Sequence, residues 1–171
     1  SPYGVRTILD SVFLKERLLA RGFSPTGFNN YVASPWQYYF RTLLRLPSAP
    51  ELPMLFGTAV HAGLKAYADK VKSGSASIED ATEAFYRELA HLPLTPLDRK
   101  ELMKTGEAAL SAYLAQESGN MQGAHESEFS ITVSLTVPGV GEVPLTGKLD
   151  RLDIKEDGTV EVIDYKTGKA K

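Results

Sequence analysis

The stretch Glu128-Phe129-Ser130-Ile131-Thr132-Val133-Ser134-Leu135-Thr136-Val137 marks a change of hydrophobic period in the chain. Its apolar residues alternate strictly with polar ones, a pattern that predicts a half-buried strand. Pro138-Gly139-Val140-Gly141 predicts a turn, and two further strands are expected over about 142–154 and 159–166. Three consecutive strands joined by short turns predict a meander.

The residues before this stretch have helical spacing instead, with apolar side chains recurring every three or four positions. Gly22 predicts the end of a first helix, and Ser34 before Pro35 predicts a helix start with Ser34 as the N-cap. Ser77 and Asp80 resemble a capping box. The other expected boundaries are a helix start at Ser24-Pro25, a loop over 47–53, a helix from about Leu55 to Lys72, and a last helix between Thr95-Pro96 and Gly119.

Five helices followed by a meander predict an α+β fold. At 171 residues and 43% apolar composition, a single domain over 1–171 is expected, mainly helical over 1–120 and with the three strands in 121–171. The chain lacks an initiator Met and ends at Lys171, which indicates a piece of a longer protein.

Composition excludes several classes of protein. The net charge of −2 argues against a protein that coats nucleic acid through bulk charge, although a local basic cleft remains compatible with it. With no cysteine, disulfides, zinc–thiolate sites and cysteine-bound clusters within the chain are excluded. No stretch approaches 18 apolar residues and the first residues do not form a secretory leader, so we expect no membrane span and a cytoplasmic protein.

Two carboxylates and a lysine gather near the ends of the last two expected strands. Asp164 and Lys166 are two residues apart and would face the same side of a strand, and Asp150 lies late in the preceding strand, roughly 5 Å away across the hairpin. Carboxylate oxygens bind Mg²⁺, which keeps several waters, and a lysine can orient a water and offset developing charge. Asp164-x-Lys166 alone is typical of a surface ion pair. Together with Gly147-x-x-Asp150-Arg151 it favours a metal-dependent site beside a phosphodiester.

Other residues near this set allow two interpretations each. His61 lies beside an apolar stripe and is either a packing or surface residue or a further metal ligand. Glu128 heads the first strand and is either an additional carboxylate of the site or a solvated charge. Lys148 and Arg151 flank Asp150, where they either contact phosphates or form ordinary surface pairs.

The aromatic segment around residue 38 is also ambiguous. Arg41 and Arg45, with the neighbouring tyrosines, could form a stacking and phosphate-contacting platform for nucleic acid. The alternative, which the helical spacing favours, places Trp36, Tyr39 and Phe40 in the core and leaves the arginines solvated.

Four blocks, in order and approximate spacing, resemble the RecB-like nuclease domains of the PD-(D/E)XK superfamily. They are residues 28–40, 56–61, 147–151 and 163–168, and the resemblance spans roughly residues 24–169. The family includes the nuclease modules of AddAB- and RecBCD-type helicase–nucleases and Cas4 relatives. The resemblance implies a restriction-endonuclease-like core, a β-meander with flanking helices, preceded here by a helical N-terminal part.

The resemblance also implies roles for single residues. His61, Asp150, Asp164 and the backbone carbonyl of Tyr165 would bind Mg²⁺ or Mn²⁺, and Lys166 would be the catalytic lysine. Glu128 matches a less strict acidic position, and Lys148, Arg151 and Lys169 are candidate DNA contacts. The implied activity is metal-dependent hydrolysis of DNA, with a helicase motor in the same chain or complex as partner.

Two departures from the family affect these expectations. Many relatives have a cysteine ligand of an iron–sulfur cluster where Ser34 stands, so no cluster is expected. The family continues after the lysine motif into a further helix and strand, which implies a C-terminally truncated core.

A rival interpretation is a nuclease-fold DNA-binding or assembly module that has lost activity. A phosphate-binding loop at Thr167-Gly168-Lys169 is weak, because the earlier glycine of a P-loop is missing.

Overall fold

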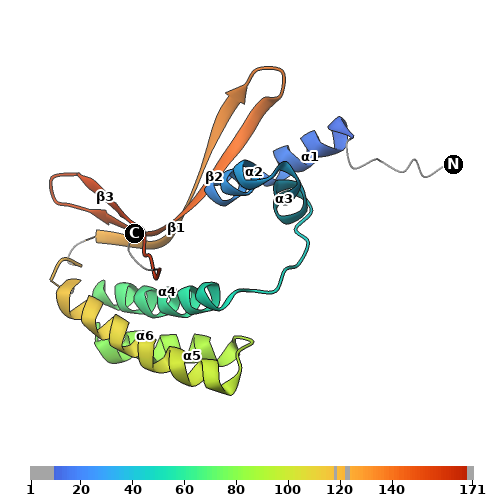
Figure 1. The fold of residues 1–171 in the computed structure, drawn as a ribbon. Coiled ribbons are helices and arrows are strands. Elements are labelled where there is room, and N and C mark those ends of the chain that lie inside the picture. The colour runs from blue at the N-terminus through green and yellow to red at the C-terminus, as the bar shows by residue number, and fades with distance from the viewer. Residues whose placement is uncertain (1–9, 118, 122–123, 169–171) are drawn as a thin grey trace. The chain divides into compact units, whose positions relative to one another are not determined.

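The computed structural model describes residues 10–117, 119–121 and 124–168, without the side chains of residues 124 and 125. Helices precede a three-stranded sheet, so the predicted α+β arrangement is confirmed (Figure 1). The sheet order is β1-β2-β3, and its strands span Ala124–Val137, Gly141–Ile154 and Val160–Ile163.

The chain divides into two compact units. Unit 1 comprises Ser1–Ser48 with Ser130–Lys148, and unit 2 comprises Ala49–Phe129 with Leu149–Lys171. Strands β1 and β2 therefore contribute residues to both units. Among the described residues, no helix is both long and apolar enough to cross a membrane.

Unit 1 begins with short helices whose starts follow from local capping. Asp10 caps α1 by accepting hydrogen bonds from the N–H groups of Val12 and Phe13, and Ser24 caps α2 by accepting from Gly27. Ser34 occupies the predicted N-cap position of α3, but its side chain makes no capping hydrogen bond. A π-helix, η1, follows α3 directly where a continued α-helix was predicted. The bounds are α1 Ser11–Arg21, α2 Pro25–Ala33, α3 Pro35–Gln37 and η1 Tyr38–Leu43.

Gly22 ends α1 as predicted, and it also permits a close approach that the sequence did not reveal. Its φ is 70°, and a Cβ at this position would lie 2.6 Å from the Pro144 carbonyl oxygen. Phe23 then forms a parallel bridge with Leu145, donating its N–H to Pro144 and accepting from Thr146. The end of α1 and the first part of β2 are thus hydrogen-bonded to each other within unit 1.

Unit 2 is built on three helices that pack against one another, α4 Leu52–Val71, α5 Ile78–His91 and α6 Pro96–Glu117 (Figure 1). The capping box at Ser77 and Asp80 is confirmed. Helix α4 starts three residues earlier than predicted, because Pro53 falls in its first turn, where the missing N–H is not needed. The core of the unit gathers Ala59, Val60, Leu64, Tyr67, Ala81, Phe85, Leu89, Leu110, Leu114 and Met121.

Strand β3 is shorter than predicted. It pairs antiparallel with β2. The ladder begins where Ile154 lies opposite Val160 and ends where Arg151 lies opposite Ile163, and residues 164–167 lie outside the strand. The expectation of a strand reaching residue 166 is therefore wrong. The physical reason is visible at Tyr165, whose N–H donates to the side chain of Asp150, at 2.7 Å, and not to a backbone carbonyl of β2.

Candidate active site

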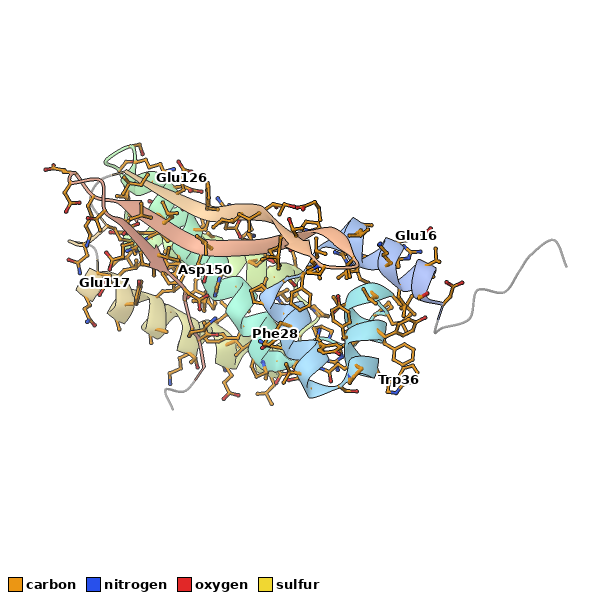
Figure 2. The ribbon with its side chains drawn as sticks, turned by 90° about the horizontal axis from the view of Figure 1, so that it is seen from above. Glu16, Phe28, Trp36, Glu117, Glu126 and Asp150 are labelled. Carbon is orange, nitrogen blue, oxygen red and sulfur yellow. The ribbon has the colours of Figure 1, made fainter. Side chains whose placement is uncertain are left out.

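The carboxylate of Asp150 is the centre of the candidate site in unit 2 (Figure 2). It lies on β2, and its side chain is 17% exposed. One oxygen, Oδ2, accepts the N–H of Tyr165, and the other, Oδ1, lies 3.2 Å from Nδ1 of His61 on α4. A helix, a strand and the segment after β3 therefore meet at one carboxyl group.

The sheet register explains why Asp164 is close by. Arg151 pairs with Ile163 at the end of the β2–β3 ladder, so one step further along an antiparallel pair lies Asp150 opposite Asp164. The two carboxyl groups interact, although residue 164 has left the strand. The juxtaposition expected from the sequence is present, with a different backbone conformation.

Asp164 and Lys166 form an ion pair, with 2.6 Å between Oδ2 and Nζ. The Lys166 ammonium is the largest cause that holds the pKa of Asp164 below its ordinary value, and the Asp150 carboxyl and the charge of His61 act in the same direction. Reciprocally, the hydrogen bond to Asp164 raises the pKa of Lys166. Both side chains are largely exposed, so both charges are accessible to a substrate from solvent.

Tyr165 connects the parts of this site. Its backbone N–H holds Asp150, and its ring packs edge-on against the rings of His61 and Tyr113, each with centroids 5.8 Å apart. Its hydroxyl oxygen accepts a hydrogen bond from Nη1 of Arg151 at 3.3 Å. Burial raises the pKa of the Tyr165 phenol to about 12.

Arg151 is buried, with 3% of its surface exposed, and it does not present its charge to solvent. Its Nε and Nη2 atoms donate to the two oxygens of Asp153 at 2.9 and 2.8 Å. Burial opposes the charge, but the hydrogen bonds to Asp153 and the nearby acidic groups hold the pKa of Arg151 above its ordinary value. Arg151 therefore makes internal contacts to Asp153 and Tyr165, and its role as a DNA contact stays a prediction.

Glu128 lies beside the same site, in an uncommon conformation. It is within β1 but has a φ of 55°, a region that non-glycine residues adopt infrequently. Together with His61, Asp150 and Tyr165 it lines a cavity of about 10 Å³, roughly the space of one water molecule. Strained backbone of this kind is often found at functional sites.

The two other basic residues predicted to contact DNA lie outside unit 2 or outside the described residues. Lys148 is exposed on β2 and belongs to unit 1. Lys169 lies outside the described residues.

The donor atoms at Asp150 suit a hard divalent cation. Imidazole nitrogen and carboxylate oxygen are both acceptable ligands. The 3.2 Å between His61 Nδ1 and Asp150 Oδ1 is close to the roughly 3 Å that separates neighbouring ligands of an octahedral ion with bonds of about 2.1 Å. In the described part of the chain no group of three or more metal-ligating side chains is already assembled. Asp164, a further candidate ligand, is paired with Lys166.

Sequence reasoning missed two supporting residues, Asp153 and Tyr113. The Arg151–Asp153 pair could have been found from the strand period, since residues two apart share a face. No local pattern marks Tyr113, which comes from α6 and reaches Tyr165 only through the tertiary fold.

Comparison with protein families gives one match. The family model described as the PD-(D/E)XK nuclease superfamily matches residues 22–171, which include all of the candidate site residues. A search of curated proteins finds no significant match.

Proposed function

The chain belongs to the PD-(D/E)XK nuclease superfamily, and from this premise we propose that it hydrolyses DNA phosphodiester bonds with Mg²⁺ or Mn²⁺. The observation that carries the proposal is the convergence of His61, Asp150 and the Asp164–Lys166 pair from three separate segments of unit 2. If Asp164 and Lys166 were only a solvated surface pair, there would be no need for His61 of α4 to contact the neighbouring carboxylate of Asp150.

In this proposal, His61, Asp150, Asp164 and the Tyr165 carbonyl hold the cation. The cation would supply Lewis-acid charge and lower the pKa of a water. Asp150 is prepared for binding, because Tyr165 fixes one oxygen and leaves the other toward His61. Glu128 is a further candidate for holding or positioning a water at the small cavity.

Lys166 would act through its charge. As an ammonium group beside Asp164 it is a donor and has no free electron pair, so its role is to contact a phosphate oxygen and offset negative charge as it develops. The ion pair keeps Lys166 beside Asp164, with 2.6 Å between Nζ and Oδ2. Lys166 would exchange this carboxylate for the phosphate oxygen.

Cleavage of end-labelled DNA tests the activity, with Mg²⁺, with Mn²⁺ and with a chelator. We expect Lys166→Ala to lower cleavage by at least 100-fold, in the range seen when one charge-stabilising donor is removed. The matched control is Lys155→Ala, which also removes an exposed lysine that pairs with a carboxylate, Glu161. Equal cleavage by the two variants would exclude Lys166 from the site.

Metal binding is measured separately by calorimetry with Mn²⁺. Asp150→Asn and His61→Ala should weaken the isotherm, whereas Asp69→Asn, on the same helix as His61 and paired with Lys65, should leave it unchanged. DNA binding without cleavage and without a metal isotherm would support the rival, an inactive nuclease-fold module.

The narrower assignment is to a RecB-like module of a DNA repair and recombination helicase–nuclease. It is supported by the order of the four motif blocks over residues 28–168. ATP-dependent degradation by the complete protein, abolished by Lys166→Ala, is the expected result; cleavage independent of any motor would contradict the helicase association.

A further inference from the structure

Unit 1 exposes aromatic side chains that the helical spacing assigned to the core. Trp36 is 52% and Phe40 38% exposed, whereas only Tyr39 of the three expected core residues is buried. Figure 2 shows Trp36 projecting outward from its short helix. Phe28 and Tyr31 of α2 are each 52% exposed as well. The core interpretation is therefore wrong for Trp36 and Phe40.

The exposed rings are arranged as a platform. Trp36 and Phe40 are four residues apart and lie nearly parallel, with an interplanar angle of 23° and centroids 6.1 Å apart. Beside Trp36 is a hollow of about 500 Å³, whose lining also includes Tyr31 and Lys15. This volume is within the range of ordinary ligand pockets.

The same region is basic although the whole chain is acidic. Residues 11–46 contain five lysines and arginines and a single acidic residue, Glu16, in a chain whose net charge is −2. Lys15, Arg41 and Arg45 are exposed, and no carboxylate of the described residues pairs with them. Desolvation and then the charges of Arg45 and Arg17 lower the pKa of Arg21, which places these arginines near one another.

We propose that unit 1 binds single-stranded DNA, with unpaired bases stacked on Trp36 and Phe40 and phosphates contacting Lys15, Arg41 and Arg45. The inference rests on the proposed nuclease function and names the form of its substrate. Base stacking on exposed aromatic rings combined with a positively charged surface is how proteins hold single strands without reading sequence.

The chemistry favours a single strand over the other occupants of such a face. Bases in a duplex are stacked on each other and leave no face for Trp36. A protein partner would bury the hollow, and protein interfaces are depleted of lysine, which Lys15 contributes here. Here Arg41 directly follows Phe40, and Lys15 shares the hollow with Trp36. The region therefore matches a polyanion with flat, apolar faces.

Trp36 is the sole tryptophan of the chain, so its emission reports on the platform directly. The experiment titrates the protein with a (dT)₁₆ oligonucleotide in the presence of a chelator, following Trp36 fluorescence and, with a labelled strand, anisotropy. We expect quenching that follows the anisotropy curve, and weaker binding of a 16-base-pair duplex. Trp36→Ala should weaken single-strand binding about tenfold, as loss of one stacked base does.

Two matched variants separate stacking from charge. Leu97→Ala removes an exposed apolar side chain from α6 and should not change binding. Arg41→Gln with Arg45→Gln should reduce the slope of log affinity against log salt by about 1.4, since each phosphate contact to a single strand contributes about 0.7. Lys100→Gln with Lys104→Gln, two exposed lysines of α6, is the charge control.

Each other outcome overturns the proposal. Binding without a change in Trp36 emission, or equal affinities of wild type and Trp36→Ala, would mean that DNA does not use the platform. Absence of single-strand binding with retained cleavage of duplex DNA would refute this inference and leave the nuclease function intact. A dimer in sedimentation that Trp36→Ala dissociates would identify the face as a contact between copies of the chain.

Discussion

Replacing Arg151 by Met should destabilise unit 2 strongly, although the substitution leaves every proposed metal ligand in place. Arg151 and Asp153 are bonded through two contacts of 2.8 and 2.9 Å, and their side chains are only 4% and 15% exposed. Removing one partner of a buried ion pair leaves the other charge desolvated and costs about 3–5 kcal/mol. Because Asp153 retains some exposure, we expect a loss of about 3 kcal/mol in the free energy of unfolding, at the lower end of that range.

The assay is urea unfolding followed by far-UV circular dichroism, whose signal includes α4, α5 and α6 of unit 2. With a denaturant slope of roughly 2 kcal/mol per molar, the midpoint should fall by about 1.5 M. Lys155→Met is the matched control, since its pair with Glu161 at 3.2 Å is more than half exposed on both sides. A surface pair of this kind contributes about 1 kcal/mol at most.

The double variant Arg151→Met with Asp153→Leu tests the reason for the loss. If an unpaired buried charge causes it, removing that charge as well should restore most of the stability, because apolar side chains replace buried pairs with little cost. A single variant that loses less than 1 kcal/mol, roughly the size of a surface pair, would refute the reasoning. A double variant as unstable as the single one would refute it as well.

Two further predictions concern unit 2. Gly106→Ala should destabilise it by about 1–3 kcal/mol through overpacking, because the new Cβ would lie 2.2 Å from the ring of the buried Phe85. The control is Gly119→Ala, whose new Cβ would meet no atom within 4 Å. Equal unfolding midpoints of the two variants would contradict the prediction. The hydrogen bond from Lys70 is the largest cause that lowers the pKa of Asp80. The stability that the Asp80 carboxylate provides should therefore be present above the ordinary aspartate pKa near 4 and be lost as the pH falls below that value. The difference in melting temperature between wild type and Asp80→Asn should therefore shrink from pH 5 to pH 2.5, and a constant difference would exclude Asp80 as its source.

Local signals predicted most of the helix starts. The capping side chains of Ser24 and Ser77 form hydrogen bonds within three residues of their own position, so the sequence contains the whole interaction. Gly22 shows the opposite case. Its role as a helix end is local and was predicted, but its approach to Pro144 joins segments more than a hundred residues apart. Such contacts leave no local pattern.

The aromatic segment was misjudged for a related reason. Helical period identifies which residues share a face, and Trp36, Tyr39 and Phe40 do recur at that spacing. The period does not reveal whether another element covers the face, and the change from α3 to a π-helix at Tyr38 alters the spacing further. Tyr39 is buried, whereas Trp36 and Phe40 are exposed.

At the candidate site, the sequence predicted that Asp150, Asp164 and Lys166 lie near one another, but from a conformation that the structure does not have. Asp164 and Lys166 were expected on one strand face, yet β3 ends at Ile163. The prediction of proximity survives because it depends on the register, which places residue 164 opposite Asp150 whether or not the ladder continues. What ends the ladder is Asp150 itself, since its side chain takes the Tyr165 N–H that a further strand residue would give to the backbone. The irregular backbone is thus a consequence of the carboxylate at the site. It also turns Tyr165 so that a single residue contacts Asp150, His61 and Arg151, a coupling that a regular strand at this position would not provide.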